Sequence, residues 1–144
     1  MTTRWDSRTG ELVLDEDACW ELLEDADVGR LGLVVVGEPE IFPVNFAVDG
    51  RTLLLRTAEG TKLAGLVMHD RVAFEVDGYD PAGGEAWSVV LKGVAHRLER
   101  FDDIYAAEDV PLFPWNVTPK QVLVRIVPTS LAGRRFTVVT GPRD

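Results

Sequence analysis

Two turn signals divide residues 31–57 into three short apolar runs, and this pattern limits the fold more than any other feature of the sequence. The runs are LGLVVV, IFPVNFAV and TLLLRT, separated by Gly37-Glu38-Pro39 and by Asp49-Gly50. Each run has the length of a strand and is rich in β-branched or aromatic residues. Asp-Gly between apolar runs is typical of a tight hairpin turn. The segment therefore predicts consecutive antiparallel strands.

The remaining sequence extends this pattern to further strands and a few short helices. Because strands and helices do not alternate regularly, a doubly wound parallel sheet is disfavoured, and a sheet of this size avoids exposed edges most simply by closing. We predict a mainly β fold, an antiparallel barrel of six or seven strands with short helices, in one domain over residues 1–144. The further elements are strands at 71–76, 87–98 with a bulge at Gly93, 121–127 and 135–140, an exposed loop at 77–85, and helices at 15–26 (ending before Gly29), 61–68 and 101–109.

Composition and charge exclude several classes of protein. The 144 residues are 46% apolar and carry a formal net charge of −9, which is typical of an ordinary globular domain and disfavours general binding to nucleic acid or anionic membranes. One cysteine and two histidines cannot build a Cys/His zinc site within one chain, and Cys19 is expected to act as a small apolar residue of the first helix. The N-terminus lacks the apolar core of a signal peptide, so we expect a cytoplasmic protein.

The segment from Arg56 to Leu63 carries the clearest chemical signal. A predicted strand ends there in a turn with Gly60, and a helix begins. Backbone N–H groups at such a join, together with the hydroxyls of Thr57 and Thr61 and the cations of Arg56 and Lys62, form a site that favours a phosphate. The spacing is not that of a P-loop, and a helix capped by Thr61 with Lys62 in solvent explains the same residues.

The segments PVNFAVDGRTLLLRTAEGTKLAGL and AWSVVLKGVAHRLE resemble the pyridoxamine 5'-phosphate oxidase-like flavoproteins over about residues 17–127. This resemblance implies an FMN-binding split β-barrel that pairs as a homodimer. It also implies that the segment RTAEGTKL holds the FMN phosphate, and that the PVNF strand runs beside the isoalloxazine ring.

Carried over by position, the resemblance assigns a set of cofactor-binding residues. An asparagine between apolar side chains suits the pyrimidine edge of a flavin, although Asn45 could instead bond nearby backbone. Trp87 could equally be a core or dimer-interface aromatic, and His96 is expected to be exposed. The implied contacts are Arg56, Thr57, Thr61 and Lys62 to phosphate and ribityl, Val44, Asn45 and Phe46 beside the ring, Trp87, Ser88 and Val89 on a neighbouring strand, and Trp115 from the second subunit or packed under a loop.

The chain also departs from the authentic oxidases, because it lacks their C-terminal basic segment, so pyridoxine chemistry is not expected. The leading interpretation is an FMN-dependent oxidoreductase that moves a hydride to or from a small organic molecule. A non-catalytic module that binds flavin or another planar ligand is the alternative. A deazaflavin-dependent reductase is a second one, with Lys92, Arg97 and Arg125 as candidate partners for a longer anionic tail. No metal site and no catalytic side chain is predicted.

Overall fold

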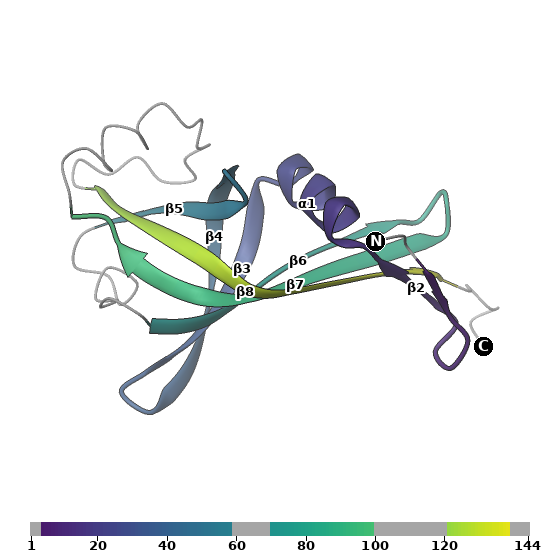
Figure 1. The fold of residues 1–144 in the computed structure, drawn as a ribbon, viewed down its shortest axis with the longest axis horizontal. Helices are drawn as coiled ribbons and strands as arrows, with labels where there is room; N and C mark the ends of the chain where they lie inside the picture. The colour runs from purple at the N-terminus through teal and green to yellow at the C-terminus, as the bar shows by residue number, and fades with distance from the viewer. Residues whose placement is uncertain (1–3, 59–69, 100–120, 139–144) are drawn as a thin grey trace.

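A computed structural model describes residues 4–58, 70–99 and 121–138, and most of this part of the chain is antiparallel β-sheet (Figure 1). This confirms the predicted mainly β fold. Among the described residues, no helix is long and apolar enough to cross a membrane. The elements are β1 (Arg4–Asp6), β2 (Glu11–Leu14), α1 (Glu16–Asp25), β3 (Val28–Val35), β4 (Glu38–Asp49), β5 (Thr52–Ala58), β6 (Asp70–Asp80), β7 (Glu85–Arg97) and β8 (Gln121–Thr137).

Six of the eight described strands close into a ring. The pairing order is β8-β5-β4-β3-β6-β7, and β7 pairs with β8 again, while β1 and β2 extend the sheet outside the ring. β8 changes its neighbour along its length, because residues 121–126 pair with β5 whereas residues 133–135 pair with β2. Figure 1 shows β6, β7 and β8 continuing beyond the ring beneath α1 toward the N-terminal hairpin. The closed ring protects strand edges, as the sequence analysis anticipated.

Side chains alternate between two faces of this sheet, which we call the inner and the outer face. The inner face carries the core and is marked by Leu31, Leu55, Phe74 and Leu91, which are fully buried. α1 packs against the continuation of this face with its buried side chains Cys19, Trp20 and Leu23. Burying one such leucine contributes about 1.5–3 kcal/mol, so the alternation fixes which residues remain available on the outer face.

The first helix and the predicted hairpin have the expected local chemistry. The Asp15 side chain accepts a hydrogen bond from the backbone N–H of Ala18 at 2.8 Å and caps α1. Cys19 is buried, and burial raises the pKa of its thiol, with the charges of Asp15 and Glu16 adding to the effect. It therefore behaves as the expected apolar residue. The β4–β5 turn consists of Gly50 and Arg51, both with positive φ (57° and 55°), as a two-residue hairpin of this hand requires.

Four points of the sequence analysis need correction. The two predicted C-terminal strands are one strand, β8, which accommodates Pro128 at a bulge. At this bulge the β7–β8 register shifts between Lys92 and Gly93, and the Thr129 hydroxyl donates to the Lys92 carbonyl at 3.2 Å. The bulge expected beside Gly93 is therefore confirmed. The expected loop at 77–85 is shorter, because β6 continues to Asp80 and pairs with β7 to the end.

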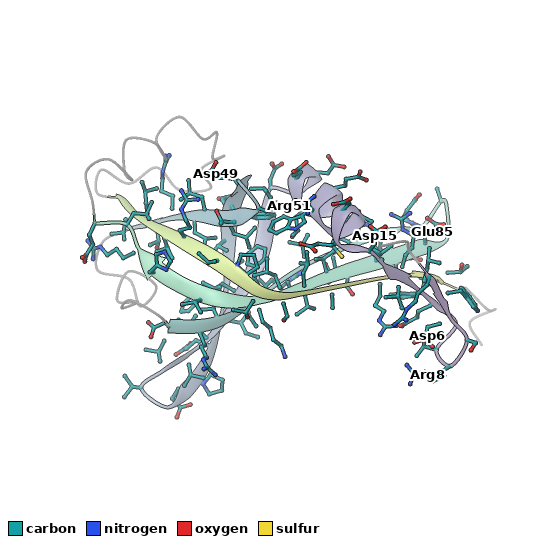
Figure 2. The ribbon with its side chains drawn as sticks, in the orientation of Figure 1. Asp6, Arg8, Asp15, Asp49, Arg51 and Glu85 are labelled. Carbon is teal, nitrogen blue, oxygen red and sulfur yellow. The ribbon has the colours of Figure 1, made fainter. Side chains whose placement is uncertain are left out.

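The third correction is the N-terminal hairpin of β1 and β2, which was not predicted. Asp6 holds this hairpin together, because its carboxylate binds Arg8 next to it at 3.2 Å (Figure 2). The same carboxylate binds Arg134 on β8 at 3.3 Å. These interactions lower the pKa of Asp6 to about 2, and the hydrogen bond to Arg8 has the largest effect. The missed signal is the sequence Asp-Ser-Arg-Thr-Gly, whose glycine, Gly10, adopts a positive φ of 71°.

Gly29 does not end the first helix, as the sequence suggested, because α1 ends at Asp25 and Ala26 forms its cap. Gly29 lies in β3 instead, directly over the ring of Phe74. A Cβ atom at Gly29 would lie 2.2 Å from Cζ of Phe74, which is fully buried. The glycine therefore makes room for the central aromatic residue of the barrel.

The variant Gly29→Ala is expected to lower the free energy of unfolding by about 1–3 kcal/mol, because the methyl group displaces the Phe74 ring in a close-packed core. Urea denaturation followed by far-UV circular dichroism measures this change. Gly32→Ala in the same strand is the matched control, since its Cβ meets only ordinary contacts at 3.8 Å and beyond. A similar loss in both variants would contradict the packing role of Gly29.

Candidate functional site

Two of the predicted cofactor-binding residues lie side by side on the outer face of the barrel. Phe46 of β4 pairs with Leu55 of β5 at the end of the β4–β5 ladder, and Asn45 and Arg56 are the next residues beyond this pair on the two strands. Both side chains point away from the core, because their neighbours in sequence are buried on the inner face. The structure thus places an amide and a guanidinium on adjacent strands of one surface.

Arg56 and Asn45 differ in the hydrogen bonds and ion pairs that they form. Arg56 is half-buried and forms no hydrogen bond or ion pair within the described ranges 4–58, 70–99 and 121–138. Asn45 is half-buried as well, and its side-chain nitrogen donates to the Asp27 carbonyl at 3.4 Å. That bond fits the alternative in which Asn45 serves nearby backbone. A positively charged group without a counter-ion beside an amide is suited to bind an anionic, hydrogen-bonding ligand.

Val44 and Phe46 belong to the core rather than to the outer surface. Val44 is 9% and Phe46 3% exposed, and the Phe46 ring meets Phe74 edge to face with 4.8 Å between centroids. This geometry contributes beyond simple burial. A ligand on the outer face of β4 would therefore contact these residues through their backbone, while the side chains support the strand from within.

The other predicted contacts on β7 are divided between the two faces. Ser88 lies on the outer face, opposite Asp77 of β6 and Arg134 of β8. Trp87 and Val89 face inward. Val89 is fully buried, and the Trp87 indole packs so closely over Gly78 that a Cβ there would lie 2.5 Å from the ring. Among the predicted β7 residues, Ser88 shares the face of Asn45 and Arg56.

An acidic cluster around Arg30, which no sequence motif predicted, lies between Ser88 and β4 on the same outer face. One guanidinium nitrogen of Arg30 lies 3.2 Å from both Glu75 and Asp77. The second carboxyl oxygen of Glu75 is buried and has no hydrogen-bond partner in the described structure. Burial, followed by the hydrogen bond and charge of Asp77, raises the pKa of Glu75. Carboxylates two residues apart in a strand share a face, which is the signal that could have revealed this cluster.

The additional cations considered for a longer anionic tail are differently placed. Arg125 donates to the Asp49 carboxylate at 3.1 Å and to the Thr52 hydroxyl at 2.6 Å, so it is committed to the β4–β5 hairpin. Lys92 is exposed on β7. His96, expected to be exposed, is half-buried opposite Arg125, and its Nδ1 atom is buried without a hydrogen-bond partner in the described structure.

Of the remaining predicted residues, Thr57 lies in the described part of the chain and three others do not. Thr57 is half-buried and alternates with Arg56, so it lies on the inner side of β5 opposite the buried Val122. The expected helices at 61–68 and 101–109 and three predicted contacts, Thr61, Lys62 and Trp115, lie outside the described residues. In the described ranges no group of three or more His, Cys, Asp or Glu residues could hold a metal ion.

A family model for pyridoxamine 5'-phosphate oxidase matches residues 15–135, which include the helix, the ring strands and most of β8. This chain belongs to that family. The result confirms the resemblance carried by the PVNF and RTAEGTKL segments.

Solved structures of similar proteins share this architecture. A FAD binding protein from Mycobacterium smegmatis superposes with a TM-score of 0.78 at 40% identity, covering 88% of this chain and 99% of that one. A protein of unknown function from Corynebacterium diphtheriae superposes with a TM-score of 0.75 at 34% identity, covering 88% of this chain and 98% of the other. The Mycobacterium tuberculosis protein Rv3129 is 44% identical over 89 residues, 62% of this chain and 79% of the relative.

The raised pKa of Glu75 predicts a specific pH dependence of stability. Its folded-state pKa lies above the ordinary value of 4.5, so the protonated carboxyl is favoured by folding and the ionised one is not. The stability that protonated Glu75 contributes is complete below pH 4.5 and is lost as pH rises through the folded pKa. Glu75→Gln should remove this loss, so that its melting temperature relative to wild type increases as pH rises above 4.5.

Thermal unfolding between pH 4 and 8, with wild type and variant measured together, tests this prediction. Glu85→Gln, an exposed carboxyl at the start of β7, is the matched control. If the difference in melting temperature between Glu75→Gln and wild type did not change with pH, the account of the Arg30 cluster would be wrong.

Proposed function

We propose that this protein binds a flavin nucleotide on the outer face of β4 and β5 and uses it as a flavin-dependent oxidoreductase. The observation that carries the proposal is that Asn45 and Arg56 lie on the outer face of adjacent strands just beyond the Phe46–Leu55 pair, and that the guanidinium of Arg56 has no counter-ion among the described residues. Family membership and the 40% identical FAD binding protein from M. smegmatis support it. The reaction we propose transfers a hydride to or from a small organic molecule.

The residues of the outer face fit the chemistry of a flavin. A flavin nucleotide needs a cation for its phosphate, hydrogen-bonding groups for the pyrimidine edge and an apolar surface for the rings. Arg56 is suited to the phosphate and Asn45 to the pyrimidine edge. Pro43 is exposed and Ile41 is 73% exposed on the same face of β4, and they offer apolar surface next to Asn45.

In this mechanism the chain's own residues bind and orient, while the bound flavin supplies the hydride chemistry. Arg56 would anchor the phosphate, and Asn45 would fix the orientation of the ring. Val44 and Phe46 would hold the strand rigid from inside the barrel, which keeps Asn45 in place. We extend the phosphate and ribityl contacts to Thr61 and Lys62, as the resemblance implies. The side chain of Thr57, which the resemblance also implies, lies on the inner side of β5 and is left out of the proposed outer-face contacts.

The kind of flavin is part of the proposal. The sequence predicts FMN, while the relative from M. smegmatis is described as binding FAD, so both need to be tested. A deazaflavin with a longer anionic tail is less favoured, because Arg125, one of the three cations considered for that tail, is already bound to Asp49. We also propose a cytoplasmic homodimer in which Trp115 of one subunit covers the flavin of the other.

Replacing Arg56 by Gln is expected to weaken flavin binding by tenfold or more, because a hydrogen bond to a charged group contributes about 1.5–3 kcal/mol. Titrations with FMN, FAD and a deazaflavin, followed by tryptophan quenching, measure this effect and identify the cofactor. Arg71→Gln is the matched control, since Arg71 is also without an ion pair in the described structure but lies at the exposed start of β6.

Binding of none of the three compounds to the wild type would refute the proposed cofactor. Binding that is equally strong in Arg56→Gln would refute the assignment of the phosphate. Anaerobic mixing of the flavin-loaded protein with NADH or NADPH then separates an oxidoreductase, whose flavin is bleached, from the non-catalytic binding module predicted as the alternative.

A further inference from the structure

The chain contains the same dipeptide, Asp-Gly, in two different backbone environments, at Asp49-Gly50 and at Asp77-Gly78. An Asp-Gly peptide bond is chemically labile, because a glycine has no side chain that shields or restricts its nitrogen. This nitrogen forms a bond to the γ-carbon of the aspartate, one water molecule leaves, and a five-membered succinimide ring results. Addition of water at the α-carbonyl then gives isoaspartate, in which the β-carbon belongs to the main chain. Water is the only co-reactant.

The first dipeptide lies where the β4–β5 hairpin turns. The ladder between these strands ends at the pair Asp49–Thr52, so Gly50 lies outside it. Gly50 is exposed and has a φ of 57°, and a Cβ atom there would meet nothing within 4 Å among the described residues. The attacking nitrogen of this dipeptide therefore belongs to an open turn.

The second dipeptide lies inside β6. Asp77 pairs with Ser88 of β7, and Gly78 pairs with Trp87. The Trp87 ring covers Gly78 so closely that a Cβ atom there would lie 2.5 Å from it. Turning the Gly78 nitrogen toward the Asp77 carboxyl group requires this ladder to open, and paired strands of a core open at the highest free-energy cost in a fold.

The carboxylates of the two aspartates have similar surroundings. The Asp49 carboxylate is paired with Arg125 at 3.1 Å, and the Asp77 carboxylate with Arg30 at 3.2 Å. The side chain of Asp49 is 39% exposed and that of Asp77 is 52% exposed. Exposure of the carboxyl group therefore predicts the faster reaction at Asp77, whereas the backbone predicts it at Asp49.

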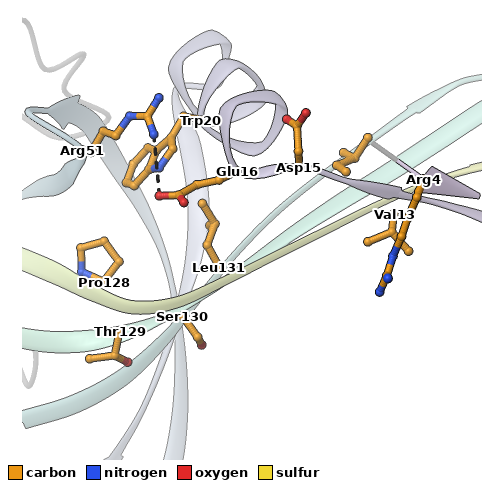
Figure 3. Close-up of a pocket in the computed structure, with 11 residues that line it drawn as sticks. Arg4, Val13, Asp15, Glu16, Trp20, Arg51, Pro128, Thr129, Ser130 and Leu131 are labelled. Carbon is orange, nitrogen blue, oxygen red and sulfur yellow. Dashed lines mark ion pairs between the residues drawn. The ribbon is translucent and has the colours of Figure 1, made fainter. Parts of the chain in front are cut away.

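Side-chain contacts restrain the β4–β5 turn from both sides. The Thr52 hydroxyl donates to the Asp49 carbonyl at 2.5 Å and accepts from Arg125 at 2.6 Å. On the other side, Arg51 is paired with Glu16 of α1 at 3.7 Å (Figure 3). A carboxylate that Arg125 holds is not free to turn toward the nitrogen that follows it, so this ion pair slows the cyclisation.

We propose that Asp49 is a site of spontaneous isoaspartate formation, that the β6–β7 ladder protects Asp77 from the same reaction, and that the ion pair with Arg125 limits the rate. The modification adds one carbon atom to the main chain at the turn of the hairpin that carries Asn45 and Arg56. The proposal does not depend on flavin binding, because it concerns the covalent structure of the turn.

Incubation of the folded wild-type protein at 37 °C and pH 7.5 over several weeks tests the proposal. Tryptic digestion places the two dipeptides in different peptides, and electron-transfer dissociation distinguishes isoaspartate from aspartate in each. We expect isoaspartate to form about tenfold faster or more at Asp49 than at Asp77, because only Asp77 requires paired strands to open. Equal rates at both positions, as in an unfolded chain, or no isoaspartate at Asp49 would overturn the proposal.

Two variants separate the ion pair from the backbone. Arg125→Gln should raise the rate at Asp49 severalfold, because its carboxylate is released. Arg30→Gln is the matched control, since it removes the ion pair of Asp77 but leaves the ladder, so the rate at Asp77 should stay at the wild-type level. An unchanged rate at Asp49 in the first variant, or an equal increase at Asp77 in the second, would show that the assigned restraints are wrong.

Far-UV circular dichroism before incubation establishes that each variant is folded. The comparison of the two dipeptides within the wild-type chain does not depend on either variant, so it remains decisive if one of them fails to fold. Flavin titration is not part of the readout, and failure of the proposed flavin site would leave the outcome at Asp49 unaffected.

Discussion

The path of β8 is the constraint on which the rest of this structure depends. One strand pairs with β7 along its length, with β5 through its first residues and with β2 through its last. The bulge at Thr129 lets it continue past Pro128, which cannot donate a ladder hydrogen bond. The change of neighbour closes the barrel on one side and leaves an unpaired stretch on the other. A cavity of about 690 Å³ borders that stretch (Figure 3), so the closure of the barrel and the cavity have one cause.

Alternation of side chains then decides which residues can take part in a site. The same period of two that buries Phe46 and Val89 presents Asn45, Arg56 and Ser88 on the outer face. A continuous sequence motif contains residues of both faces. The residues predicted to contact the cofactor from such motifs therefore include both core and surface side chains. The proposed flavin site therefore rests on alternate positions of neighbouring strands, with the intervening residues supporting it from inside.

Much of the fold could be predicted because local signals agreed with the global structure. The Asp49-Gly50 turn, the capped first helix and the apolar strands are each determined by residues close in sequence. The continuity of β8 and the extension of β6 could not be predicted in this way. Pro128 is compatible with a strand only because of the bulge opposite Gly93. Gly78 is compatible with strand β6 because the Trp87 ring packs over it. Both depend on contacts between distant segments, as does the Arg30 cluster.

Because the chain is acidic, an arginine that has no ion pair among the described residues is unusual. At a net charge of −9, acidic partners are abundant, and Arg30, Arg51, Arg125 and Arg134 each have one or more. An arginine that lacks a partner in such a chain keeps a local positive potential where the overall field is negative. Arg56, which has no partner among the described residues, does so beside an amide on the outer face. The groups around it, and not the charge alone, then determine which anion it selects.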